Sequence, residues 1–211
     1  MSTAFPYLGF LSVSLLIAAS PGPSWLYTIS TTLRQGRRAG MIGNLGNSTG
    51  VLCHALITAF GLSVLLSYSV ATFHLLKFLG VVYLCYLAWR SFRTPPLQAA
   101  TQTLEQMISK RSIYINGIFV SLFNPKIFLL MVALLPQFIA PDSPNPNMQL
   151  AIMGSMHALV AGLLHTFLIF FSNEIAKRLR TSGTTQKWLQ RATGTLFFGF
   201  GVRLAMARQS G

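Results

Sequence analysis

Acidic side chains are scarce in this sequence. Its 211 residues include 3 Asp and Glu against 16 Lys and Arg, and charged residues make up 9% of the chain. Soluble domains carry about 25% charged residues, so the composition is not typical of one. The three acids, Glu105, Asp142 and Glu174, fall in expected loops or at the end of an expected helix. A proton relay or a hydrolytic centre that depends on buried carboxylates is therefore not expected.

Cysteine pairs and catalytic motifs are also lacking. Cys53 and Cys85 have neither metal-site nor disulfide spacing, and we interpret them as small packing residues within helices. Four histidines without clustered cysteines or carboxylates make a metal-ion substrate the weaker alternative to an organic one. There is no HExxH motif and no interpretable Ser/His/Asp set, so an intramembrane enzyme is a still weaker alternative. We expect no catalytic residues, no metal and no cofactor.

Long apolar runs dominate the chain instead. Apolar residues make up 52% of it. Six runs are near or above the ~20 residues that cross a bilayer as a helix. They are Phe5–Thr32, Met41–Leu66, Val70–Trp89, Ile113–Leu135, Met148–Ser172 and Leu189–Met206. This pattern predicts an all-α polytopic membrane protein, with six transmembrane helices in one lipid-embedded domain over residues 1–211.

The basic residues predict how these helices are oriented. The net charge of +13 is not a nucleic-acid patch, because most basic residues lie in three loops on one side of a six-span chain. We expect these loops in the cytoplasm and both termini outside. The first of them, Leu33–Gly40, is predicted as a tight turn to which Gly36 and Gly40 are suited. The basic residues of the three loops are Arg34, Arg37, Arg38, Arg90, Arg93, Lys110, Arg111, Lys177, Arg178, Arg180, Lys187 and Arg191.

Two proline motifs interrupt the apolar runs. The first run would form a helix of about 42 Å, longer than a ~30 Å hydrocarbon core, and Pro21-Gly22-Pro23 predicts a break within it. Asn124-Pro125-Lys126 predicts a second break near the middle of the fourth run. Here Lys126 places a charge at membrane depth, which costs roughly 2.5–3.5 kcal/mol and indicates a function. Backbone groups freed at each break must be satisfied by protein or line a wet cavity.

Polar and small residues form stripes on two of the expected helices. The first stripe consists of Gly43, Asn47, Gly50, His54 and Gly61, and the second of Gly154, His157 or Ala158, Ala161 and His165. Small residues let helices approach closely, so one interpretation is a pair of packing faces with interhelical hydrogen bonds. The other is a polar wall along a substrate path.

The two halves of the chain match weakly. We divide it into a first repeat at about 5–92, a linker at 93–111 and a second repeat at about 112–206. Pro23 aligns with Pro125, and His54 with His157. A third match pairs Lys77, Gly80 and Tyr83 with Arg191, Gly194 and Phe197. Three spans per half give the halves opposite orientations, which predicts inverted repeats with broken helices one and four and a site at their interface.

Several motifs together resemble a known family. They are Ser20-Pro21-Gly22-Pro23, Gly36-Arg37-Arg38-Ala39-Gly40, the Gly80/Tyr83 pattern, Asn124-Pro125-Lys126 and Leu135-Pro136-Gln137-Phe138. In a six-span chain they resemble the lysine-exporter superfamily, and within it the homoserine/threonine resistance branch. The resemblance covers about residues 5–206 and implies a bacterial inner-membrane exporter of amino acids or close derivatives, driven by the proton gradient. Members often have Asn where this chain has Ser24, and the superfamily also includes metal-ion exporters.

A substrate path is expected where the two breaks meet. We expect the half-helix that starts near Ser24, helped by Lys126, to bind a substrate carboxylate, and carbonyl groups freed by the prolines to bind its ammonium. Without buried carboxylates, His54, His157 or Lys126 would have to carry the coupling proton. Which amino acid is exported, and whether the protein is a homodimer, stay open at this stage. The candidate path or helix-break residues are Pro21, Gly22, Pro23, Ser24, Asn47, Asn124, Pro125 and Lys126.

Overall fold

The described part of the chain is helical. The computed structural model describes residues 4–68, 108–139, 143–181 and 183–206, and single positions between them at 78, 81, 82, 85, 86, 88, 89, 92 and 93. The α-helices are α1 (Ala4–Ala19), α2 (Pro23–Tyr68), α4 (Lys110–Leu122), α5 (Pro125–Leu129), α6 (Pro146–Phe170), α7 (Ser172–Thr181) and α8 (Gly183–Met206). A π-helical turn, η1 (Leu130–Leu134), and a 3₁₀ turn, η2 (Leu135–Phe138), follow α5.

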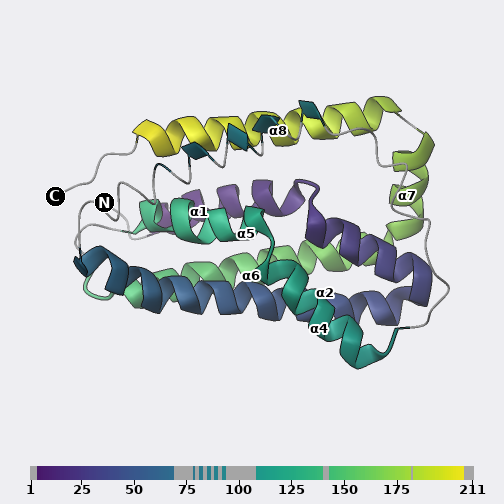
Figure 1. The fold of residues 1–211 in the computed structure, drawn as a ribbon, viewed down its shortest axis with the longest axis horizontal. Coiled ribbons are helices and arrows are strands. Elements are labelled where there is room, and N and C mark those ends of the chain that lie inside the picture. The colour runs from purple at the N-terminus through teal and green to yellow at the C-terminus, as the bar shows by residue number, and fades with distance from the viewer. Residues whose placement is uncertain are drawn as a thin grey trace.

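The first predicted break is confirmed. Helix α1 ends at Ala19 and α2 begins at Pro23, and the two are bent by 52°. Helix α2 contains a second interruption at Gly36, where φ is 82° and ψ is 172°. At this point the chain doubles back, so the end of the first expected span and the second expected span share α2 (Figure 1). Glycine is suited to this conformation because it has no Cβ.

The turn between these two segments is shorter than the sequence suggested. Residues on both sides of Gly36 are helical, and Gly40 lies within the helix rather than in a turn. A Cβ atom built on Gly40 would lie 2.1 Å from the Oγ1 of Thr32. The expectation that Gly40 serves the turn is therefore wrong, because that glycine is needed for close packing across the reversal.

The second predicted break is also confirmed. Helix α4 ends at Leu122 and α5 begins at Pro125, with a bend of 47° between the two arms. Ser109 caps the start of α4, where its Oγ accepts a hydrogen bond from the Ser112 backbone N–H at 3.2 Å. The π-helical turn after α5 was not predicted.

The segment after α6 differs from expectation. The basic residues predict a loop between the fifth and sixth spans, but residues 172–181 form helix α7. Figure 1 shows α7 standing across the end of the bundle, with α8 running back from it along the opposite edge to α2. Acidic Glu174 lies in the first turn of α7, as suits the positive end of a helix dipole.

The described residues show fewer candidate spans than the sequence predicts. Helix α6 is long and apolar enough to cross a membrane, and each of the two bent pairs qualifies as one broken span. Among the described segments this makes up to three spans, against the six expected. Helix α8 does not qualify, and its first turns are polar, with Thr184, Lys187 and Arg191.

Several predictions fall outside the described residues. The third expected span is described only at single positions, and the linker only from residue 108 and at position 93. Lys77, Gly80, Tyr83 and Arg90 are among the positions not described, so the third repeat match stays a prediction. The same holds for the loop positions of Glu105 and Asp142.

The two cysteines are both free thiols. Cys53 on α2 is half-buried, whereas Cys85 is exposed. The interpretation of Cys85 as a packing residue is therefore wrong for the described structure.

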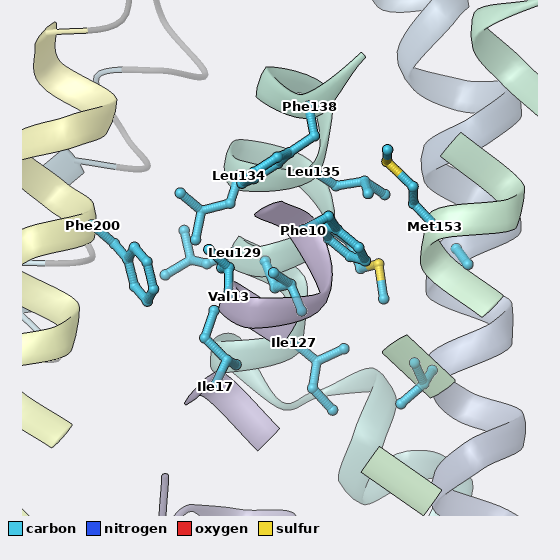
Figure 2. Close-up of a cluster of buried hydrophobic side chains, with 14 of the residues drawn as sticks. Phe10, Val13, Ile17, Ile127, Leu129, Leu134, Leu135, Phe138, Met153 and Phe200 are labelled. Atoms are coloured by element: carbon cyan, nitrogen blue, oxygen red, sulfur yellow. The ribbon is translucent and has the colours of Figure 1, made fainter. Parts of the chain in front are cut away.

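A buried apolar core lies where α1 meets the second broken helix. Figure 2 shows α1 residues among the side chains of α5, η1 and η2, with Met153 of α6 on one side and Phe200 of α8 on the other. The rings of Phe10 and Phe138 meet edge to face, with centroids 5.6 Å apart. This core holds the two broken helices together next to their breaks.

Glycines bring α2 and α4 into backbone contact. A Cβ atom built on Gly46 would lie 2.1 Å from the carbonyl oxygen of Tyr114, and one built on Gly50 would lie 2.5 Å from the Cβ of Ser121. On α4, a Cβ atom built on Gly117 would lie 2.4 Å from the carbonyl oxygen of Gly43. The packing interpretation of this stripe is thus confirmed for Gly43 and Gly50. Among the described residues, Gly61 has no neighbour nearer than 4.0 Å.

This contact predicts a large difference between two glycines of the same helix. Gly46→Ala should destabilise the protein by about 1–3 kcal/mol, because its Cβ meets backbone atoms that cannot move aside. Gly61→Ala is the matched control and should leave stability unchanged or slightly raised. Thermal unfolding of the two purified variants in detergent measures this. Equal melting temperatures for both would contradict the close approach of α2 and α4.

Candidate functional site

The first break is closed by hydrogen bonds to the end of α1. The last carbonyl groups of a helix have no partners within it. Here the Trp25 Nε1 donates to the Ala18 carbonyl at 2.8 Å, and the Ser20 Oγ donates to the Ile17 carbonyl at 2.7 Å. The chain then turns through Pro21 and Gly22 into α2, where the Leu26 N–H donates to the Gly22 carbonyl at 3.0 Å.

The second break is closed by a side chain at each end. Asn124 caps the start of α5, because its Oδ1 accepts from the Lys126 backbone N–H at 3.1 Å. At the end of α4, the Leu122 carbonyl accepts from the Nε2 of His54 at 2.9 Å. His54 belongs to α2, so a residue of the first half of the chain closes the break in the second half.

The two breaks contact each other directly. The Lys126 Nζ donates to the Ser20 carbonyl at 2.6 Å and to the Ile17 carbonyl at 3.0 Å, and it lies 3.3 Å from the Ser20 Oγ. Next to it, the Asn124 Nδ2 donates to the Ser24 Oγ at 3.0 Å. A Cβ atom built on Gly22 would lie 3.3 Å from the Lys126 Nζ, so the glycine lets the ammonium reach the break. We call the set Ile17, Ser20, Gly22, Ser24, Asn124 and Lys126 the junction.

The charge of Lys126 is buried without an acidic partner on the helices around it. Its side chain is 7% exposed. Helices α1, α2, α4, α5 and α6 contain no Asp or Glu. The ammonium instead lies at the C-terminal end of α1, where the helix dipole is negative and favours a cation. The sequence predicts that Lys126 faces a substrate carboxylate, whereas in the structure it bonds to the carbonyl groups that were expected to bind the substrate ammonium.

Asn47 lies one helical turn beyond the junction. Its Nδ2 donates to the Thr28 Oγ1 at 3.4 Å, and Thr28 follows Ser24 by one turn of α2. Both residues are buried, and the Oδ1 of Asn47 is among the buried polar atoms for which the described residues provide no hydrogen-bond partner. A buried acceptor without a partner is costly, so it marks a position that a polar ligand group or a water would satisfy.

His157 lies near the junction but bonds elsewhere. Its Nδ1 shares a hydrogen bond with the Ser14 Oγ on α1 at 2.8 Å, and it is buried. His165, two turns further along α6, is buried as well.

Sequence reasoning brought the correct motifs together but missed their partners. Pro21–Ser24 and Asn124–Lys126 contact each other, whereas His54 and His157 are hydrogen-bonded to Leu122 and Ser14. The missed residues are Ser14, Trp25 and Thr28, and Ser20 was named only as part of the first motif. Their hydroxyl or indole groups interrupt an apolar run, which is the one signal that could have identified them.

Among the residues placed by the structure, no three His, Cys, Asp or Glu side chains gather as a metal site would require.

Comparison with known proteins identifies the family. The model of the LysE type translocator family matches residues 15–208, which includes both breaks. The chain belongs to this family. It is 33% identical over 208 residues to a homoserine/homoserine lactone efflux protein of Salmonella typhimurium, covering 97% of this chain and 98% of the relative.

Other relatives cover the chain equally well. An uncharacterized membrane protein of Bacillus subtilis is 30% identical over 208 residues, covering 95% of this chain and 98% of the relative. A leucine efflux protein of Salmonella choleraesuis is 24% identical over 199 residues, covering 94% of both. No solved structure matches the chain. The resemblance drawn from the motifs is thus confirmed, and the chain is a membrane translocator of the LysE type.

The cap at the second break gives a testable stability effect. Asn124→Ala removes both the helix cap and the bond to Ser24, and should lower the free energy of unfolding by about 1–2 kcal/mol. Asn173→Ala, at an exposed position of α7, is the control and should change little. Chemical denaturation in mixed micelles gives both values, and a stability loss no larger in Asn124→Ala than in the control would contradict the role of Asn124.

Proposed function

We propose that the protein exports amino acids or close derivatives, of the homoserine, threonine or neutral type, across the bacterial inner membrane. The observation that carries this proposal is the contact between two helix breaks at the buried, polar junction of a LysE type translocator. Broken helices that meet in the membrane are a recurring way to build a substrate site in transporters. The candidate path runs along Pro21–Ser24, Asn124–Lys126 and Asn47.

The names of the relatives support this substrate class. Homoserine and homoserine lactone share an amine and a short polar carbon chain, but the lactone has no free carboxylate. Leucine shares the amine and the carboxylate with homoserine and has an apolar side chain. The amine is the one group common to all three molecules. The amine is therefore the main group that the proposed site binds.

Reciprocal contacts at the breaks support an inverted repeat. Lys126, from the second half, closes the break of α1, and His54, from the first half, closes the break after α4. Each half thus supplies the cation or donor that satisfies the carbonyl groups of the other. Two halves related by a pseudo-two-fold axis would show this exchange.

A contact between two basic segments supports their placement on one side of the membrane, which we propose is the cytoplasmic side. The Arg37 Nη2 donates to the Phe170 carbonyl at 3.3 Å, and the guanidinium lies 5.4 Å from the centre of the Phe170 ring. Arg37 follows the reversal at Gly36, and Phe170 precedes basic helix α7. The positive charges of both segments therefore meet at the same end of the bundle, consistent with the positive-inside rule.

Proton antiport is the coupling mode we propose, with His157 as the titrating group. His157 is buried on α6 and bonds to a hydroxyl that can either donate or accept. His54 donates its Nε2–H to a backbone carbonyl, an arrangement that suits a structural cap. A change of charge at His157 would change the electrostatic potential at Lys126 and so affect the junction.

An export assay tests the substrate class. Overproduction in a bacterial host should raise resistance to homoserine and other small neutral amino acids, and these should accumulate outside the cells. Ser24→Ala should reduce this export, because it removes the hydroxyl shared with Asn124, and Lys110→Ala at the exposed start of α4 is the control. Resistance to transition-metal ions without amino-acid export would favour the metal-ion alternative instead.

Two histidine variants test the coupling. In inside-out vesicles, His157→Gln should lose the stimulation of transport by a pH gradient but keep exchange of labelled substrate, because a neutral amide cannot titrate. His54→Gln retains an N–H donor for the Leu122 carbonyl and should keep the gradient dependence. Gradient-dependent transport in His157→Gln equal to wild type would rule out His157 as the coupling group.

A further inference from the structure

The end of α1 forms a cage of oxygen atoms around one ammonium group. Its members are the carbonyl oxygens of Ile17 and Ser20 and the Oγ of Ser20, at 3.0, 2.6 and 3.3 Å from the Lys126 Nζ. An ammonium has three N–H donors and no acceptor, so three oxygens match its bonding capacity in full. We call these three atoms the α1 cage.

Only one positive charge fits this cage. The helices around it contain no acid, so the negative end of the α1 dipole is the main compensation for the buried charge. A second ammonium at the same place would meet the charge of Lys126 at a few ångströms in surroundings of low dielectric constant, which is strongly unfavourable. Lys126 and the amine of a bound molecule therefore exclude each other here.

We propose that the α1 cage is the amine-binding site of the exported molecule, and that the Lys126 side chain occupies it as a built-in competitor when no substrate is bound. This rests on the proposed function, because it takes the exported molecule to carry a primary amine. On substrate binding the Lys126 ammonium leaves the cage, and the substrate amine takes over its bonds to Ile17 and Ser20.

The geometry suits an exchange at this point. Lysine has a flexible four-carbon stem, so its ammonium can withdraw while the helices stay in place. Gly22 provides no side chain between the ammonium and the break. Ser24 and Asn124 lie beside the cage and present a hydroxyl and an amide to the rest of a bound molecule. A purely structural cap would need none of these features beyond the lysine itself.

Chemical rescue tests whether the cage accepts a free amine. Lys126→Ala empties the α1 cage, and n-propylammonium chloride should raise its melting temperature in detergent by several degrees in a saturable way. Tetramethylammonium carries the same charge without N–H donors and should have no such effect, and neither should sodium butyrate. Wild type and Lys110→Ala, whose cages stay filled, should not respond to n-propylammonium. Equal melting temperatures of Lys126→Ala in n-propylammonium and in tetramethylammonium would overturn the proposal.

A binding measurement tests the competition itself. Lys126→Gln removes the charge that excludes a second ammonium, so radiolabelled homoserine lactone should bind about tenfold more tightly than to wild type if the lysine fills the cage most of the time. Unchanged or weaker binding would overturn the proposal. Failure of both variants to fold, with no recovery in n-propylammonium, would also overturn it, since Lys126 would then be an indispensable cap.

These outcomes separate the inference from the proposed function. If wild type exports homoserine but Lys126→Gln binds the lactone no more tightly, the competitor role fails and the export function stands. If wild type neither exports nor binds any amino acid or lactone, the proposed function fails, and rescue of Lys126→Ala by n-propylammonium reports only on the cage.

Discussion

The carbonyl groups at the end of α1 are the constraint on which this structure depends. Pro21 and Pro23 prevent α1 from continuing, and within a membrane no water is at hand to satisfy the carbonyl groups that remain. Protein donors must therefore come from elsewhere, and Lys126 and Trp25 supply them. Lys126 follows Pro125 in the second break. Its hydrogen bonds to the end of α1 therefore fix the position of the second break relative to the first.

The remaining contacts follow from this pairing. His54 reaches the end of α4 only because α2 and α4 approach at backbone distance, through Gly46, Gly50 and Gly117. The apolar core of α1, α5 and the turns after it then packs next to the polar contact. The groups that bond across the two breaks are also those that a substrate would contact in the proposed function.

Features that depend on local interactions were predicted correctly from the sequence, whereas features that depend on contacts between distant residues were not. Both breaks and the turn at Gly36 were predicted, because proline and glycine act on their own backbone. Gly40, Cys85 and residues 172–181 were interpreted wrongly. Neighbours that are distant in sequence decide whether a glycine packs against another helix and whether a cysteine is buried. They also decide whether a basic segment is helical. No local sequence pattern indicates the π-helical turn or the hydrogen-bond partners of Lys126.

The sequence by itself determined that the chain is helical and membrane-embedded, that two helices are broken, and that it resembles amino-acid exporters. These properties follow from composition, run length and residues that dictate their own conformation. Only the tertiary structure decided that the two breaks touch and that Lys126 bonds to carbonyl groups rather than facing a free anion. The reason is physical: a buried ammonium takes whichever acceptors the fold brings within about 3 Å, and residues 17 and 126 are brought together by packing alone.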